Sequence, residues 1–516
     1  MQKYFKHNCI IVFFYLITFP LLAQESPDFP TLEFGAVFKN DTREIPLEIL
    51  GNDEDGFYVL YSRGRFGQGK QSIRKFNLNL TPTGQEIDLN ETEEKRRTVG
   101  IAQFEDKIVH VWTELSDTGK SYYYQNVDLE AFSLGEKRFL TEIKNDSKSA
   151  RYTGASFFPD PETNTFQLFY TIPNKNKEMQ RVKLQHFDTD FNLINENEFE
   201  LPYTNKQFTL YKVLKGNDDE ILVLGKNYFG SNIVALEGKK QYEHILYRIK
   251  DGTLEKLATI PADGKHLRYL SCVMKDDGHL LLSSLYSDKN MYGLKGIFQT
   301  KINVQDGTVL YSQFNPLDAD FFTKLMPEGK RQKKVMKKVQ ENTFEAPYYI
   351  LNKSMELASG GSLFLAEQIH SQTIYNSTTY YHENLAVFQL DESGKMQWSN
   401  AIGKKQQKRN VAIYSSYLTI PKDDATFLIY NGNLENLNHS NGSVINAFTQ
   451  GSALIAAKIH ADGHYERKML TDKTEMEGIT IRPGLSNWID ENTLLLFGQD
   501  IDNLKNQRFV KVKFTP

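Results

Sequence analysis

The chain has 516 residues, of which 24% are charged and 40% are hydrophobic, and its formal net charge at pH 7 is −4. This mildly acidic balance gives no reason to expect a nucleic-acid partner, which usually selects a markedly basic face. Length alone would suggest two or three domains, but internal repeats indicate a single domain.

The N-terminus has the pattern of a secretory signal peptide. Lys3 and Lys6 precede an apolar run that ends at Leu22, and Ala23 offers a small residue for cleavage before Gln24. The run is too short for a stable membrane span, so an uncleaved anchor is the less favoured alternative. We expect residues 1–23 to be removed and residues 24–516 to form one soluble, monomeric domain, exported to the periplasm or the cell surface.

A short β-rich segment, Leu32 to Phe38, stands alone before the first repeat. A repeat unit of four predicted strands then recurs along the chain, and the second strand of each unit is strongly apolar. These apolar strands begin at residues 57, 108, 166, 221, 280, 363, 427 and 494. Four meandering strands per unit, repeated in this way, are typical of the blades of a β-propeller.

Tight turns separate the third and fourth strands of the later units. They are Asp251-Gly252, Asp306-Gly307, Ser393-Gly394 and Asp462-Gly463. Glycine takes the positive φ angle of such hairpin turns without steric cost, and Asp tolerates it. The fold class predicted is therefore all-β, a single β-propeller.

Seven units are complete, whereas the last one ends after its third strand. If Leu32 to Phe38 supplies the missing outer strand, the ring closes without an open edge between its first and last blades. We therefore predict eight four-stranded blades, with seven as the alternative.

One unit is longer than the others and carries an insertion between blades five and six. From Pro327 to Gln340 the spacing of Val335, Met336 and Val339 predicts a short amphipathic helix. Seven basic residues lie between Lys324 and Lys338. The favoured interpretation is a solvated helix face; the alternative is a site for an anionic partner.

The stretch from His266 to Tyr430 resembles a group of uncharacterised exported bacterial β-propeller proteins. The motifs that carry the resemblance are Leu285-Tyr286-Ser287-Asp288, Leu294-Lys295-Gly296-Ile297-Phe298, the Lys-rich insertion, Phe364-Leu365-Ala366-Glu367-Gln368, Tyr414-Ser415-Ser416-Tyr417 and Tyr430-Asn431. The resemblance implies the fold and export, and it implies no activity.

Signatures of bound cofactors and metals are weak. Gly394 and Trp398 form one copy of a quinoprotein-type blade motif, which predicts blade packing and no quinone. His460 and His464 flank a hairpin turn, so they do not share a helical face for a metal ion. We predict no cofactor and no metal site, the catalytic residues stay unknown, and the thiol of Cys272 is expected to be buried and inert.

Basic residues recur at or beside the starts of the strands expected to be innermost. They are Arg43, Arg97, Arg151, Lys206, Arg268, Arg409 and Arg482. On one rim of the channel they would create a ring of positive potential, although the composition alone would give several such coincidences. The candidate ligand-binding residues, for an anionic group, are Arg97, Arg151, Arg268 and Arg409.

The function predicted is that of a non-enzymatic binding or scaffold protein that uses one propeller face for a protein or glycan partner, including an anionic one. The alternative is a carbohydrate-active enzyme, a glycoside hydrolase or lyase, with paired carboxylates at the channel mouth. The sequence does not decide whether catalysis occurs, and it leaves the ligand unidentified.

Overall fold

A computed structural model describes residues 28–41, 44–64, 70–89, 96–104, 107–115, 119–144, 155–172, 178–204, 206–216, 220–229, 242–289, 293–324, 326, 328–357, 359–438 and 452–515. The signal peptide predicted for residues 1–23 and the candidate Arg151 lie outside these ranges. In the described ranges, none of the helices has both the length and the apolar character needed to span a bilayer.

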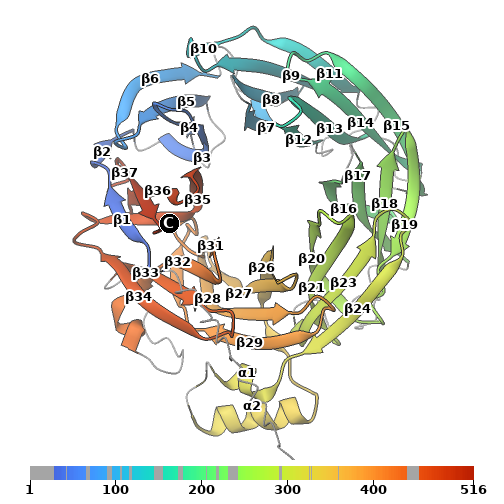
Figure 1. The fold of residues 1–516 in the computed structure, drawn as a ribbon, viewed down its shortest axis with the longest axis vertical. Helices are drawn as coiled ribbons and strands as arrows, with labels where there is room; N and C mark the ends of the chain where they lie inside the picture. Colours follow the sequence, from blue (N-terminus) through green and yellow to red (C-terminus); the bar gives the residue numbers. More distant parts are fainter. Residues whose placement is uncertain are drawn as a thin grey trace, which may run out of the picture.

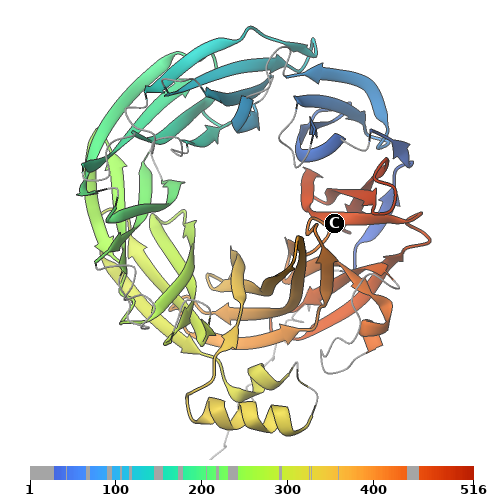
Figure 2. The ribbon, with the colours of Figure 1, turned by 180° about the vertical axis from the view of Figure 1, so that it is seen from behind.

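Eight antiparallel sheets follow one another in sequence order around a ring, which confirms the eight-bladed β-propeller (Figures 1 and 2). The strands of each blade are given from the innermost outward. Blade one contains β3 (Glu44–Asn52), β4 (Gly56–Arg63), β5 (Lys70–Asn77) and β6 (Pro82–Asp88), and blade two contains β7 (Arg96–Gln103), β8 (Lys107–Leu115) and β9 (Gly119–Asp128), with β10 (Ser133–Leu134) and β11 (Arg138–Lys144). Blade three contains β12 (Ala155–Asp160), β13 (Thr165–Ile172), β14 (Met179–Asp188) and β15 (Leu193–Thr204), and blade four contains β16 (Phe208–Lys215), β17 (Ile221–Tyr228), β18 (Tyr242–Lys250) and β19 (Thr253–Thr259).

The last four blades keep the same order. Blade five contains β20 (His266–Met274), β21 (His279–Ser287), β23 (Gly296–Asn303) and β24 (Val309–Pro316), and blade six contains β26 (Tyr349–Glu356), β27 (Ser362–Ile374), β28 (Ser377–Leu390) and β29 (Met396–Ile402), with β30 (Gln406–Arg409) paired to β28. Blade seven contains β31 (Leu418–Lys422), β32 (Ala425–Asn433), β33 (Ser452–Ile459) and β34 (Tyr465–Asp472), and the 3-10 helix η4 (Leu434–Asn438) directly follows β32. Blade eight contains β35 (Ile479–Asp490), β36 (Thr493–Asp500) and β37 (Asn506–Lys513).

The ring is closed by the N-terminal segment, as the sequence predicted. β1 (Thr31–Phe34) pairs antiparallel with β37, with Leu32 opposite Val512, and the two-residue strand β2 (Phe38–Lys39) pairs with the start of β37. Lys511 and Lys513 both form ion pairs with Glu33. The first and last parts of the chain therefore share blade eight, and its third strand has no open edge there.

The apolar second strands hold neighbouring blades together. In β4, Tyr58 and Leu60 belong to the hydrophobic cluster shared with blade two, whereas Phe57, Val59 and Tyr61 belong to the cluster shared with blade eight. Alternate side chains of a strand point to opposite faces of its sheet, so a strand buried on both faces must be apolar at every position. This is why these strands were visible in the sequence.

Aromatic side chains at the fourth strands dock on the turn of the next blade. Trp398 of blade six donates its Nε1–H to the carbonyl of Ala461 at 2.9 Å, and its ring covers Gly463, where any Cβ would collide with it. Tyr311 of blade five covers Gly394 in the same manner. The predicted packing role of Trp398 is confirmed, and both glycines also have positive φ angles, 85° and 78°.

The insertion between blades five and six is confirmed and contains two helices, α1 (Ala319–Thr323) and α2 (Lys330–Gln340), which lie outside the ring beside β29 (Figure 1). Asp318 caps the N-terminus of α1, and its carboxylate accepts a hydrogen bond from the Phe321 amide at 2.8 Å. The phenyl rings of Phe321 and Phe388 of blade six lie 5.7 Å apart. The insertion thus rests on the core of blade six. The shorter helix α1 was not predicted.

All innermost strands run in the same direction in a ring of identical blades, so they all begin on one face, which we call the top face. The hairpin between the second and third strands of a blade opens toward the same face. In blade six this hairpin, β27 and β28, extends beyond β26, which pairs only as far as Gln368. The insertion also reaches the top face, because it ends where β26 begins.

Candidate functional site

The described arginines of the predicted basic rim occupy different settings. Arg97 lies in the innermost strand β7 and is exposed. Arg268 lies in the innermost strand β20, and its Nη1 donates to the carbonyl of Tyr349 at 3.0 Å. Contrary to the sequence prediction, Arg409 is not at the start of an innermost strand: it lies in β30, which pairs with β28 of blade six, whereas the innermost strand of blade seven begins at Leu418. Its Nε donates to Ser377. That these groups gather around one anion stays a prediction.

A second candidate ligand-binding site is a groove on the top face between the insertion and blade six. We call it the blade-six groove, and it consists of two adjoining cavities that share Lys338, Phe344 and Pro347. The first cavity has a volume of about 630 Å³ and the second about 570 Å³.

The first cavity has an apolar floor built by the insertion. Phe321 and Phe322 of α1 and Val335 of α2 are buried there, and the half-buried Met326 and Phe344 pack against the same cluster. The rings of Phe322 and Phe344 meet edge to face at 5.1 Å. A cavity floored by phenyl, thioether and branched aliphatic groups favours an apolar ligand group.

Three cations of α2 line this first cavity. Arg331, Lys334 and Lys338 follow one another at spacings of three and four residues, which places them on the same side of the helix. All three are exposed, and none of them forms an ion pair with any acidic side chain in the described ranges. By contrast, Lys337, one position before Lys338, pairs with Glu341 at 3.7 Å.

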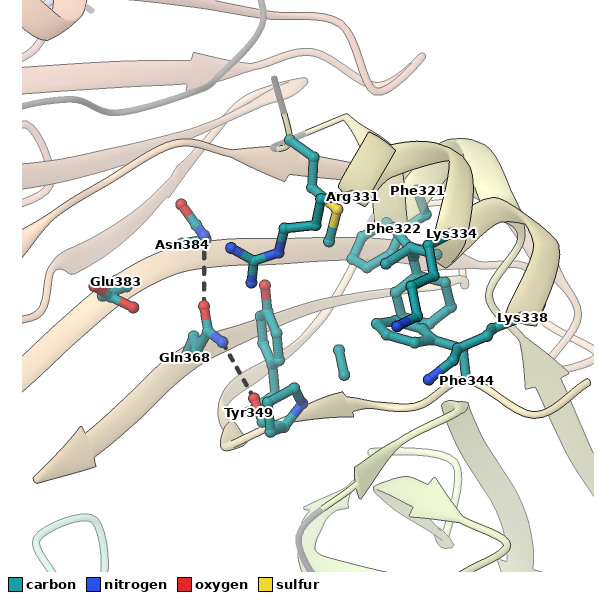
Figure 3. A pocket seen from close by; sticks show the side chains of 14 residues that line it. Phe321, Phe322, Arg331, Lys334, Lys338, Phe344, Tyr349, Gln368, Glu383 and Asn384 are labelled. Atoms are coloured by element: carbon teal, nitrogen blue, oxygen red, sulfur yellow. Dashed lines mark hydrogen bonds between the residues drawn. The ribbon is translucent and has the colours of Figure 1, made fainter. Parts of the chain in front are cut away.

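The opposite wall of the first cavity belongs to blade six. Figure 3 shows Gln368, Glu383 and Asn384 facing the side chains that extend from α2. The Asn384 amide donates to Gln368 Oε1 at 3.4 Å, and Gln368 Nε2 donates to the carbonyl of Pro347 at 3.3 Å. These bonds tie the hairpin to the segment that leaves α2.

The second cavity contains an exposed aromatic ring in an unusual backbone setting. Tyr348 has a φ angle of 68° and 45% of its surface is exposed. Its ring lies 5.5 Å from the ring of His370, which in turn stacks on Tyr381 at 4.4 Å. A bulky residue with positive φ is strained, and such residues concentrate where function requires a fixed side-chain position.

The acidic residue of the second cavity has a structural role. Glu345 accepts hydrogen bonds from Ser287 Oγ at 2.7 Å and from the Asp288 amide at 2.9 Å. Beside Glu345, β22 (Gly293–Leu294) pairs with β25 (Ala346–Pro347). This pairing holds the segment between α2 and β26 against blade five.

Behind the groove lies a buried polar network centred on Glu367, the residue before Gln368. Glu367 has no exposed surface, forms an ion pair with Lys404, and accepts hydrogen bonds from Ser416 Oγ at 2.7 Å and Asn352 Nδ2 at 3.1 Å. His382 Nδ1 lies 3.3 Å from the same carboxylate. Burial by itself would raise the pKa of Glu367, but Lys404 and His382 lower it to about 2.

The network joins blades six and seven. Lys404 also donates to Gln406 Oε1 at 2.7 Å, and Gln406 Nε2 donates to the carbonyl of Asn431 in β32 at 2.8 Å. Ser416, whose φ angle is 73°, donates its amide to Gln406 at 2.7 Å. The root of the β27–β28 hairpin, and with it one wall of the groove, is therefore held by a connected set of buried hydrogen bonds.

Other candidate chemistry is sparse. Within the described ranges no group of three or more His, Cys, Asp or Glu side chains is placed to hold a metal ion. Cys272 is only partly buried, whereas the sequence predicted a buried thiol. Desolvation still raises the pKa of its thiol to about 11, so the thiol is protonated at neutral pH.

Comparisons with known proteins give the chain no family and no activity. No protein-family model and no curated protein matches the chain. Among solved structures it is similar to prolyl oligopeptidase B from Galerina marginata, with 8% identity over 92% of this chain and a TM-score of 0.38. The chain spans only about 55% of the length of that enzyme.

Two further structures are similar to this chain over nearly their whole length. The β-propeller domain of the Trilobed protease from Pyrococcus furiosus matches with 12% identity, 87% of this chain, 97% of that chain and a TM-score of 0.33. The polysaccharide lyase Uly1 matches with 8% identity, 93% of this chain, 99% of that chain and a TM-score of 0.40. At these identities and TM-scores the comparisons attach no activity to the chain.

Proposed function

We propose that this protein is an exported, non-enzymatic binding protein whose ligand is anionic and binds in the blade-six groove. The observation that carries the proposal is the row of Arg331, Lys334 and Lys338, three exposed cations that line a cavity and form no ion pair in the described part of the chain. A protein that is acidic overall keeps such a row of like charges at a cost in repulsion, which a bound anion relieves.

The surroundings of the row support binding. The opposite wall is fixed by the buried network around Glu367, so the groove exists before the ligand arrives and little ordering is needed on binding. A preformed cavity with an apolar floor and a few convergent charged groups is the usual form of a ligand site.

The test uses two polyanions, poly-L-glutamate and polygalacturonate, with the mature chain at low salt. We expect either or both to raise the melting temperature and to bind measurably by calorimetry, because a ligand that binds only the folded state stabilises it. The variant Lys334→Glu/Lys338→Glu should weaken binding at least about tenfold, since each reversal places a negative charge beside the ligand.

The matched control is Lys330→Glu/Lys333→Glu, which makes the same change of charge on the same helix but away from the groove lining. It should retain affinity within about twofold at 150 mM salt, where charges beyond about 8 Å are screened. Absence of binding by both polyanions, or an equal loss in the control variant, would refute the proposal.

A further inference from the structure

The groove offers more than a positive charge, and its remaining features select among anionic ligands. We propose that the ligand is an extended acidic segment of a partner protein, with carboxylate side chains at alternate positions and an apolar side chain between them. This inference rests on the proposed function, since it names the ligand class of the same groove.

The apolar floor favours a polypeptide over an acidic glycan. Below the exposed cations the cavity presents Phe344, Met326 and the buried Val335. Hydroxyl groups of a sugar placed against these side chains would lose water without gaining hydrogen-bond partners, which costs free energy. An apolar side chain loses nothing there and gains from burial.

The spacing of the cations matches an extended chain. Lys334 and Lys338 are four residues apart, so the helical rise separates them by about 6 Å along α2. In an extended strand, side chains on the same face recur every two residues, about 6.6 Å apart. Two acidic residues at alternate positions can therefore meet Lys334 and Lys338, while the residue between them points to the floor.

The two cavities adjoin at Lys338, which favours an extended ligand long enough to enter both. An extended chain can continue past Lys338 into the second cavity. There it meets the exposed ring of Tyr348, which lies against the ring of His370 in a tilted arrangement.

The test compares three fluorescent probes: a peptide of four glutamates around one phenylalanine, the same peptide with serine in place of the phenylalanine, and tetragalacturonate. Fluorescence anisotropy with the mature chain should show the phenylalanine peptide binding at least about tenfold more tightly than the other two. Lys334→Glu/Lys338→Glu should weaken the binding of both peptides.

A substitution in the apolar floor separates the contribution of apolar contacts to peptide affinity from the contribution of charge. Phe344→Ala should abolish the difference between the two peptides, whereas Phe344→Leu, which keeps an apolar side chain, should retain most of it. The melting temperature of each variant reports whether the insertion still folds, and the leucine variant carries the test if the alanine variant does not fold.

The outcomes also distinguish this inference from the proposed function. Equal affinity for the two peptides would overturn the apolar anchor, and tighter binding of tetragalacturonate would overturn the protein segment; in both cases the groove remains an anion site. If no probe binds, and the polyanions also fail, both proposals are refuted together.

Discussion

The carboxylate of Glu367 and the ammonium of Lys404 form an ion pair in which neither side chain has more than 1% of its surface exposed. The two residues come from the second strand of blade six and from the connection to blade seven. Charges removed from water in this way depend on each other, because either one alone would be buried without a counter-charge.

Removing one partner should therefore destabilise the propeller strongly. Glu367→Gln leaves the Lys404 ammonium buried without a counter-charge, and we expect a loss of about 3–5 kcal/mol in the free energy of unfolding. The double variant Glu367→Gln/Lys404→Met should lose less than the sum of the two single variants, because it removes both charges. Thermal and urea unfolding of the four proteins measures this coupling.

An exposed ion pair supplies the control. Glu341→Gln removes the partner of Lys337 on the surface of α2 and should change the melting temperature little. Single variants of Glu367 and Lys404 whose effects add up would show that the two charges do not depend on each other.

The same pair predicts how stability depends on pH. The pKa of Glu367 is lowered from 4.5 to about 2 in the folded protein, so between these values the unfolded chain binds more protons than the folded one. The stabilisation is complete above about pH 4.5 and is lost as the pH falls toward 2. Melting temperatures measured from pH 7 to pH 3 should fall more steeply for the wild type than for Glu367→Gln. Parallel curves would contradict the assignment.

The N-terminal closure makes a third prediction. Deleting the residues up to Lys39 removes the partner strand of Val510 and Val512 and the carbonyl of Gly35, to which Arg508 Nε donates at 2.6 Å. We expect the melting temperature to fall by more than about 5 °C, because an edge and its apolar face become exposed.

Point variants refine this test. Leu32 packs against the core of blade eight, whereas Thr31 in the same strand is exposed. Leu32→Ser should therefore destabilise the protein and Thr31→Ser should not. A truncated chain that melts within a degree or two of the full mature chain would show that β1 and β2 are dispensable.

Most of the fold could be predicted because its signals are local. Each blade can be recognised in the sequence by one continuous apolar strand and by turn residues with a fixed conformational preference. Gly394 and Gly463, which have positive φ angles, are examples of such turn residues. Even the closure by Leu32 to Phe38 followed from counting strands, since the last unit had three.

The blade-six groove was harder to predict from the sequence because it is assembled from residues that lie far apart in the chain. Glu367 stands as a single charge in an apolar strand, which was a visible anomaly, but its partners Lys404 and Ser416 follow 37 and 49 residues later in irregular connections. The basic side of α2 was recognised, yet the sequence favoured a solvated face. The cavity beneath it depends on the short helix α1 and on how residues 341–349 return to blade six, neither of which has a periodic signal.

Export is a fourth prediction and depends on residues before the described part of the chain. The mature protein should begin near Gln24, because Ala23 ends the apolar run with the small residue that signal peptidases require. N-terminal sequencing of the protein from its native host measures this directly. Recovery of Met1, or retention in the membrane pellet after a salt wash, would argue for an uncleaved anchor.

The basic rim of the channel is a fifth prediction, and it competes with the blade-six groove as the site of anion binding. If Arg97, Arg151, Arg268 and Arg409 face one channel mouth, their forked guanidinium groups should hold a sulfate, a uronic acid or a carboxylate in two-point fashion. The variant Arg151→Ala/Arg268→Ala should then abolish the stabilisation by sulfate and acidic oligosaccharides at low salt.

Variants can distinguish anion binding at the basic rim from anion binding in the blade-six groove, because the rim arginines differ in whether they also stabilise the fold. Arg268 donates to the carbonyl of Tyr349, so its removal should lower the basal melting temperature whether or not it binds a ligand. Arg97 is exposed in β7, and Arg97→Ala therefore reports on the anion alone. If Arg97→Ala leaves the anion-induced shift intact while Lys334→Glu/Lys338→Glu removes it, the groove is the site and these arginines are surface and structural residues. The reverse result would place the anion at the channel mouth.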